Sequence, residues 1–519
     1  MRHTRASRYK SHHTWFYILL TKLRLPAPAE AAAAAVFLIT CIALFVPPYI
    51  GMADNGDFFR VAYGNGLFYD LPDYDSRYLG YFVREYGIFQ YHNESGSAVF
   101  SSQSLFIRAA IVLNQLLYHP HQFDIRYQAA LYTVLYTGAV FMLVKSVTWK
   151  MPRTKGYLVA ALAVFVFGDT AYTAYFNSFY GESVVLIMVM LLFASGLLLY
   201  HRKFNDYVNL GIFGISALLL TTSKQQNAPV GVLVAMLAVL LLFIRKERLF
   251  RVVAGVLSLT LLAASIGSYV LIPQQFVNIN KYHAMTRGVL LHAADPEATL
   301  KSFGINPQFA ILNQSLYYSP YTTVDVDSEL LESQFYSRYG FGSILAYYLT
   351  HPDQAKQMLD LAAQHGFTIR PSAMGNYELS AGKPFGAQTT FFSGYSMLKE
   401  SLAPRTFGFI VLWGLLVLGL YARSFLAGWS RRDMRELVRL PLLLTMMLIG
   451  LSGIVVSIVG AGDADLAKHE FLFTIVFDLI TFITLADLIG RQLGWAGTER
   501  VQGKPSTTRM TQGERTLHA

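Results

Sequence analysis

The sequence predicts an all-α polytopic membrane protein. Of its 519 residues, 54% are hydrophobic and only 14% are charged, whereas soluble domains carry about 25% charged residues. Long apolar runs recur along the chain, and each is long enough to cross a bilayer as a helix. These observations favour one membrane-embedded unit over a string of soluble domains.

On the criterion of about 20 mostly apolar residues per helix, the chain contains about ten candidate spans. They lie near Ala31–Ile50, Asp124–Val147, Tyr157–Tyr175, Glu182–Tyr200, Tyr207–Thr222, Ala228–Ile244, Val252–Ile272, Phe407–Ala427, Leu440–Gly460 and Glu470–Ile489. The single cysteine, Cys41, lies in the first run, which excludes an internal disulfide and a cysteine-based metal site.

Basic residues predict the orientation of these spans. Alternate connections are rich in Lys and Arg: Lys150–Lys155, His201–Lys203, Arg245–Arg251 and Arg431–Arg439, together with the leader and the tail. Because such residues collect in cytoplasmic loops, we expect an even number of spans with both termini in the cytoplasm. The net charge of +10 follows from this topology, and nucleic-acid binding is the poorer interpretation.

The same topology divides the chain into five parts. In order they are a basic leader at 1–30, an N-terminal transmembrane module at 31–272 with an outer loop at 51–123, an outer helical segment at 273–405 between the seventh and eighth spans, C-terminal transmembrane helices at 406–490, and a cytoplasmic tail at 491–519. The leader is not expected to be a cleavable signal peptide, so it is expected to stay on the protein. The tail is expected to be disordered.

Local signals place helices inside the two outer segments. Ser101-Ser102-Gln103 is typical of a helix start, and its polar stripe of Ser104, Arg108 and Gln115 favours a helix in the membrane interface over an eleventh span. In the second segment, Asp295-Pro296-Glu297 predicts a helix that Gly304 ends, and His351-Pro352-Asp353 predicts another over 354–364.

Two carboxylates, Asp54 and Asp57, follow directly on the first span. With Gly56 between them they can face one side of a tight turn, and partial desolvation at the membrane edge raises a carboxyl pKa toward general-base use. The local pattern alone favours the other interpretation, in which Asp, Asn and Gly merely form a turn after a helix.

Two further polar clusters fall on the same predicted face. Glu182 begins the fourth span, where it either serves a site or stabilises a helix N-terminus, and Lys224 ends the fifth, where it either contacts a phosphate or snorkels. Asp463 and Asp465 precede the last span and suit either a divalent cation or a solvated turn. Asp478 and Asp487, inside the last span, are expected to pair within the bundle.

No Walker loop, HExxH or GxSxG in a suitable context is present. The missing Walker loop argues against an ATP-driven pump, and the long aromatic outer segments argue against a compact secondary transporter.

Five groups of residues follow one another along the chain: Asn55-Gly56-Asp57 with Arg60, Asn177-Ser178-Phe179-Tyr180-Gly181-Glu182, Asp295-Pro296-Glu297 with Gly304-Ile305-Asn306-Pro307, Arg370-Pro371-Ser372 with Gly375-Asn376-Tyr377-Glu378, and Lys468-His469-Glu470-Phe471-Leu472-Phe473. In this order they resemble the GT-C class of membrane glycosyltransferases and, more closely, the bacterial glycan-biosynthesis hexose transferases of the WsfD type.

The resemblance implies transfer of a hexose, with inversion, from a polyprenyl-phosphate donor to a surface glycan or lipid-linked acceptor. It implies that an acidic residue of the first outer loop acts as a base or through a metal. Here that role falls to Asp57, with Asp54 as the fallback. Glu182 is then the matching acidic residue of the second outer loop. Candidate cations beside the phosphate are Arg60, Lys224, Arg287 and His469, and a divalent cation such as Mg²⁺ or Mn²⁺ is a possible cofactor. The alternative is a flippase of lipid-linked glycan without transferase activity.

Overall fold

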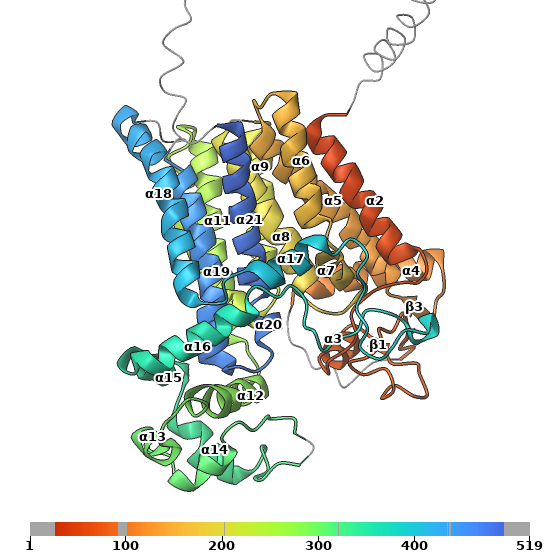
Figure 1. Ribbon diagram of the computed structural model, residues 1–519, viewed down its shortest axis with the longest axis vertical. Helices are drawn as coiled ribbons and strands as arrows, with labels where there is room; N and C mark the ends of the chain where they lie inside the picture. The colour runs from red at the N-terminus through yellow and green to blue at the C-terminus, as the bar shows by residue number, and fades with distance from the viewer. Residues whose placement is uncertain are drawn as a thin grey trace, which may run out of the picture.

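The computed structural model describes residues 26–91, 101–201, 203–319, 321–432, 434 and 437–491. Most of the predicted basic leader and of the tail lies outside these residues. Figure 1 shows a bundle of long helices with two outer segments gathered at one of its ends, which we call the cap end.

Helices occur at all ten positions where the hydropathy predicts spans. They are α2 (Pro28–Phe45), α5 (Arg126–Thr148), α6 (Arg153–Phe167) with the bent continuation α7 (Thr170–Thr173) and η1 (Ala174–Asn177), α8 (Glu182–Tyr200), α9 (Asp206–Thr221), α10 (Ala228–Leu241), α11 (Arg248–Val270), α18 (Phe407–Arg431), α19 (Arg439–Ala461) and α21 (Phe471–Gly490).

The fold class is therefore confirmed as all-α and polytopic. In the described part of the chain, seven helices are long and apolar enough to cross a membrane. The number is eight when α6 and its continuation Thr170–Asn177, which are bent by 49° relative to each other, count as one span. This strict number is lower than ten because α9 and α10 have only 16 and 14 residues, short of the roughly 20 that a full crossing needs.

Helix α8 is the centre of the bundle. It is apolar all round, which is typical of a helix buried on every side, and 89% of its most apolar stretch is buried against its neighbours. Helices α11 and α18 lie at the edge and expose rows of large apolar side chains such as Leu259, Ile266, Leu412 and Leu415. These rows are the surfaces that a bilayer would cover.

The first outer segment contains a small antiparallel sheet that hydropathy did not predict. Its elements are α3 (Phe58–Gly64), β1 (Leu67–Phe68), β2 (Glu85–Ile88), α4 (Gln103–Leu117) and β3 (Gln122–Asp124). The strand order is β1-β2-β3, with Leu67 opposite Ile88 and Tyr86 opposite Phe123. Helix α4 begins where the sequence predicts, with Ser102 as its N-cap residue.

The second outer segment folds into short helices over the cap end. They are α12 (Gln274–His283), η3 (Ala284–Val289), α13 (Pro296–Ser302), η4 (Pro307–Leu312), α14 (Glu329–Gln334), η5 (Tyr336–Arg338), α15 (Phe341–Thr350) and α16 (Pro352–His365). Asp295 caps α13 by accepting a hydrogen bond from the Ala298 amide (3.0 Å), and Gly304, with φ of +70°, follows its end, as predicted. The apolar core of this segment includes Ile454, Ile458 and Phe473, which seat it on α19 and α21.

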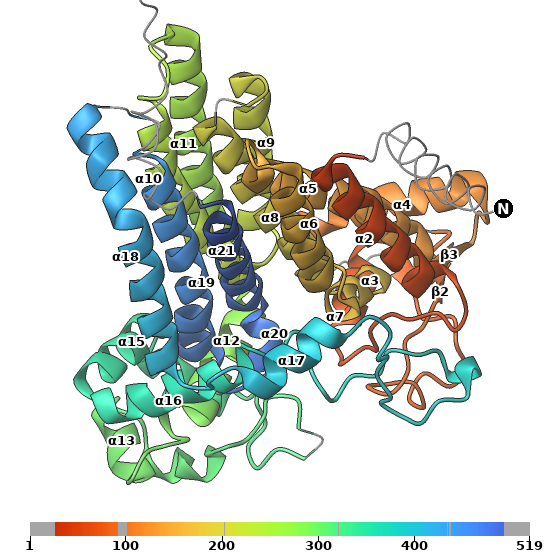
Figure 2. The same cartoon turned by 45° about the horizontal axis from the view of Figure 1, so that its top comes forward.

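The chain then returns from the second outer segment to the first. Residues 366–393, with η6 (Leu379–Ala381), lead to α17 (Gly394–Leu402), which lies between the two segments in both views (Figures 1 and 2). The backbone at Gly375–Tyr377 pairs with 50–53: the Gly51 amide donates to the Asn376 carbonyl (2.9 Å), and Ile50 and Tyr377 form a bridge. A side chain at Gly375 would lie 1.8 Å from the Gly80 carbonyl oxygen, so this contact requires glycine. The return segment thus fixes the stretch that carries Asp54 and Asp57.

Candidate active site

Asp54 holds the turn between α2 and α3. Its carboxylate is 5% exposed; Oδ1 accepts from the Gly56 amide (2.7 Å) and the Phe58 amide (3.1 Å), and Oδ2 accepts from the hydroxyls of Tyr69 (2.6 Å) and Tyr74. Burial together with the Asp54 charge raises the pKa of both tyrosines. The turn interpretation therefore describes Asp54, because two amides and two hydroxyls occupy its oxygens.

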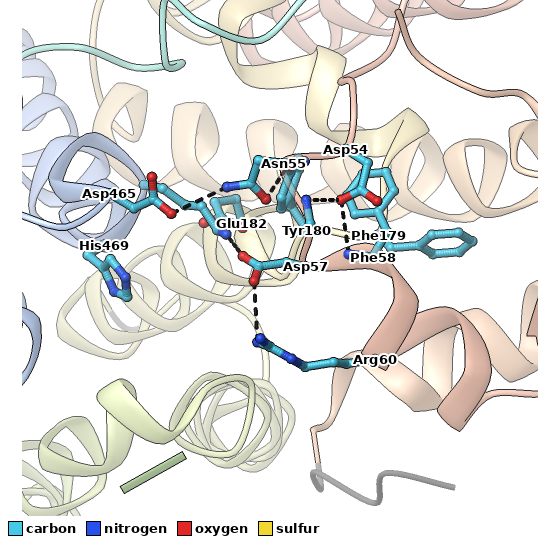
Figure 3. Close-up of polar contacts among 12 residues, drawn as sticks. Asp54, Asn55, Asp57, Phe58, Arg60, Phe179, Tyr180, Glu182, Asp465 and His469 are labelled. Atoms are coloured by element: carbon cyan, nitrogen blue, oxygen red, sulfur yellow. Dashed lines mark hydrogen bonds and ion pairs between the residues drawn. The ribbon is translucent and has the colours of Figure 1, made fainter. Parts of the chain in front are cut away.

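Asp57 behaves differently, although it occupies the N-cap position of α3. Its side chain makes no capping hydrogen bond and remains 38% exposed. One carboxylate oxygen lies 3.3 Å from Arg60 Nη1, and the other contacts Lys468 Nζ. In Figure 3, Arg60 reaches Asp57 from α3, while Asn55 and Asp465 lie on the other side. Asp57 is thus an accessible carboxylate between two cations.

Lys468 reaches the site from α20 (Leu466–His469), directly before the last span. Its ammonium lies 4.9 Å from the centre of the Tyr180 ring, an arrangement that stabilises a cation. Burial lowers its pKa to about 8, against the raising effect of the Asp54 charge. Asp465 begins this turn with φ of +51° and accepts a long hydrogen bond (3.4 Å) from Asn55, which ties α20 to the first loop.

Glu182 and Lys224 form an ion pair at the end of the bundle. Glu182, the first residue of α8, is fully buried, and its Oε1 accepts from Lys224 Nζ at 2.5 Å. Its Oε2 has no hydrogen-bond partner within the described residues. The charge of Glu182 also adds to burial in raising the pKa of Asp465. Lys224 is therefore engaged with a carboxylate rather than snorkelling.

Arg287 and Asp463 are also brought together. Arg287, in the π-helical turn η3, donates to both carboxylate oxygens of Asp463 (2.6 and 2.7 Å) and to the Gln314 carbonyl (3.0 Å). A Cβ on Gly462, where φ is +62°, would lie 2.4 Å from the Arg287 carbonyl carbon. The contact between Arg287 and Asp463 thereby holds the second outer segment against the turn that leads to Lys468.

His469 pairs with Gln226. Its Nδ1 lies 2.7 Å from the Gln226 side-chain oxygen, and its carbonyl accepts from the Gln226 amide group (3.1 Å). Burial, and then the charges of Lys468 and Lys224, lower its pKa to about 3. His469 is therefore a neutral imidazole near pH 7 rather than a cation.

The carboxylates do not converge as metal ligands. Arg287 occupies both oxygens of Asp463, whereas Asp465 contacts Asn55. Within the described ranges, no group of three or more His, Cys, Asp or Glu side chains could hold a metal ion. The residues present do not fit a divalent cation.

Sequence reasoning missed the roles of Lys468, Asn55 and Tyr180. The Tyr180 hydroxyl lies 2.9 Å from the Ala53 carbonyl and 3.0 Å from Asn55 Oδ1, so it supports the first loop from the end of the bundle. The sequence did contain a signal for Lys468, because this lysine lies shortly before an apolar span, in a loop with other charged residues.

These features define the class of the protein. It is a polytopic α-helical membrane protein whose charged residues from distant loops meet at one end of the bundle. Residues 20–505 match the family model described as the YfdI N-terminal transmembrane domain, and the chain belongs to that family. The family is GT-C-like, so the chain is a membrane glycosyltransferase-like protein; the finer resemblance to the WsfD type is not confirmed. None of the curated proteins matches the sequence significantly.

Proposed function

We propose that this protein transfers a hexose from a polyprenyl-phosphate donor to a glycan or lipid-linked acceptor, with inversion, and that Asp57 is the base. The proposal rests on the partners and the exposure of the three candidate carboxylates. Asp54 is occupied by four donors and Glu182 is buried against Lys224, whereas Asp57 is accessible and has cations beside it.

The transfer needs a base, a leaving group and a cation. The acceptor hydroxyl gives its proton to Asp57 as its oxygen attacks C1 of the sugar. The bond between C1 and the phosphate oxygen breaks, and the electron pair leaves on polyprenyl phosphate. The transition state carries positive charge on the sugar ring, which a carboxylate stabilises, and a cation stabilises the charge that grows on the phosphate.

Lys468 is the cation we assign to the donor phosphate. It lies in α20, the short helix before the span α21, so it suits a phosphate whose lipid chain lies in the bilayer. In the free protein Lys468 contacts Asp57. A donor phosphate that draws Lys468 away would leave that oxygen of Asp57 open to the acceptor hydroxyl. Arg287, held by Asp463, and Lys224, held by Glu182, then position the loops.

We place the cap end on the non-cytoplasmic side. Helix α11 begins at Arg248 and α18 ends at Arg431, and Figure 1 shows both of these helix ends opposite the cap end. Cytoplasmic loops collect such residues. The same reasoning keeps both termini in the cytoplasm.

A reconstituted assay tests the activity. Purified full-length protein in detergent is incubated with polyprenyl-phosphate glucose, galactose or mannose carrying a radiolabel, and with lipid-linked glycan extracted from the source cells. We expect label on the glycan from one of the donors. Absence of transfer, together with movement of the lipid-linked glycan across liposomes, would instead support a flippase.

Metal removal is expected to leave transfer unchanged. Asp54, Asp57 and Asp463 already have partners, and in this proposal a cationic side chain supplies the positive charge at the phosphate. A loosely held Mg²⁺ keeps several waters and is readily removed by a chelator. Rates with excess EDTA should therefore match those with added Mg²⁺ or Mn²⁺. Loss of activity with chelator and recovery with a divalent cation would contradict this.

The pH dependence should report Lys468. Its ammonium is charged below its pKa of about 8 and neutral above it, so kcat/KM for the donor should fall as the pH rises through about 8. In Lys468→Arg the guanidinium stays protonated, so any activity that remains should lack this fall. An unchanged fall in the arginine variant would show that another group titrates.

A further inference from the structure

The side of Asp57 that faces the second outer segment carries aromatic rings. The Arg60 guanidinium carbon lies 5.2 Å from the centre of the Phe59 ring, 4.9 Å from that of Phe276 and 5.6 Å from that of Tyr318. Arg60 Nη2 also donates to the Tyr318 hydroxyl at 2.8 Å. Arg60 therefore links Asp57 to Tyr318.

Tyr318 is fixed in place but uncovered. Its ring is supported by that of Tyr317, at 5.1 Å between centres and an angle of 69°. Tyr317 is itself 4% exposed, donates its hydroxyl to Asp327 (2.6 Å) and donates its amide to His283 Nε2 (2.9 Å). Tyr318 nevertheless remains 59% exposed. Its conformational freedom is already restricted while its apolar face stays in water, which favours a ligand that covers the ring.

A second fixed ring borders the turn that precedes Asp57. Tyr78 is 39% exposed, and its hydroxyl donates to the Asn55 carbonyl at 3.0 Å. A Cβ on Gly56 would touch this ring, at 3.4 Å from its hydroxyl oxygen, so Tyr78 borders the turn before Asp57. Two anchored tyrosines thus lie near the accessible carboxylate, Tyr318 through Arg60 and Tyr78 through the turn at Asn55 and Gly56.

The ligand that matches this arrangement is a pyranose. A sugar ring offers an apolar C–H face to an aromatic ring and hydroxyls to polar groups at its rim, and binding sites commonly combine aromatic walls with a few such groups. Arg60 and Asp57 supply the polar groups here.

We propose that Tyr318, with Tyr78, forms the acceptor subsite, where the terminal sugar of the acceptor stacks on Tyr318 and directs its hydroxyl to Asp57. This rests on the proposed function. The acceptor is assigned in preference to the donor sugar because the donor is tethered to the bilayer, near Lys468 and α21. Tyr318 belongs to the second outer segment and reaches Asp57 through Arg60.

The experiment compares three single variants of the full-length protein. Tyr318→Ala removes the ring and the hydroxyl, Tyr318→Phe removes only the hydroxyl that contacts Arg60, and Tyr321→Ala removes a 95% exposed tyrosine of the same loop. Initial rates are measured with polyprenyl-phosphate hexose and extracted lipid-linked glycan, each varied in turn. Hydrolysis of the donor by water is measured without acceptor.

Tyr318→Ala is expected to raise the acceptor KM by about tenfold or more, with donor KM and donor hydrolysis unchanged. Tyr318→Phe keeps the ring but loses the contact with Arg60, so its acceptor KM should lie between those of the wild type and Tyr318→Ala. Tyr321→Ala should stay close to the wild type. An unchanged acceptor KM in Tyr318→Ala overturns the inference, as does a rise in donor KM alone, which would assign the ring to the donor sugar. If Asp57-dependent transfer persists in either case, the proposed function stands. If the wild type neither transfers nor hydrolyses the donor, both proposals fail.

Discussion

Replacing Asp57 with asparagine is expected to lower sugar transfer by about 100- to 10,000-fold, the usual contribution of a positioned general base. The amide keeps nearly the same shape but cannot take a proton from the acceptor hydroxyl. Because Asp57 is 38% exposed and makes no capping hydrogen bond, the fold should tolerate the change. Protein level and the thermal unfolding midpoint in detergent are expected to stay near those of the wild type.

Asp75→Asn is the matched control, since Asp75 is an exposed acid of the same outer loop. It should keep full activity. Asp54→Asn provides a second comparison, because its Oδ2 accepts from two tyrosine hydroxyls and an amide nitrogen at that position cannot. It should lower stability as well as activity. A fully active Asp57→Asn enzyme would remove Asp57 from the mechanism.

The contrast between these two acids shows where sequence reasoning stopped. Both follow the first span and both are flanked by turn residues, so the local pattern gave them the same pair of interpretations. The difference comes from Tyr69 and Tyr74, which bind Asp54, and from Lys468, which contacts Asp57 across more than 400 residues. Local patterns contain no record of such distant partners.

The spans were predictable for the opposite reason. Hydropathy acts within each helix, so the ten apolar segments are visible without knowledge of their neighbours, and α8 matches its predicted limits of Glu182–Tyr200. The strands β1 to β3 and the pairing of Ile50 with Tyr377 depend on contacts between distant parts of the chain. Arg287 was predicted as a phosphate ligand from its charge and predicted side, and its bond to Asp463 became visible only in three dimensions.

Breaking the buried ion pair between Lys399 and Asp478 is expected to cause the largest loss of stability. Lys399, on α17, lies 2.6 Å from an oxygen of Asp478, inside the span α21, and the Tyr172 hydroxyl donates to the other oxygen. The two side chains are only 4% and 0% exposed, so the sequence-based expectation that Asp478 pairs inside the bundle is confirmed. Lys399→Met leaves a buried carboxylate without its cation, which typically costs about 3–5 kcal/mol.

Thermal unfolding in detergent measures this loss, and two further variants test its cause. In Lys399→Met with Asp478→Asn the buried charge is removed with its partner, so the double variant should be more stable than Lys399→Met alone. Glu247→Gln alters a pair in which the acid is 55% exposed and should change stability by less than about 1 kcal/mol. A double variant no more stable than the single one would show that packing of the lysine stem, rather than charge, holds α17 to α21.

Variants of the ion pair and of Asp57 should have opposite effects, one on stability and the other on turnover. Lys399 anchors the segment that braces residues 50–53 but does not contact Asp57 in the described residues. At low temperature, where the Lys399→Met protein remains folded, its turnover per folded molecule should therefore stay close to that of the wild type. Asp57→Asn should show the reverse, with a normal unfolding midpoint and little turnover. If Lys399→Met instead lost turnover while folded, the return segment would be needed for catalysis. Small displacements of residues 51–57 would then move the base out of line with the donor.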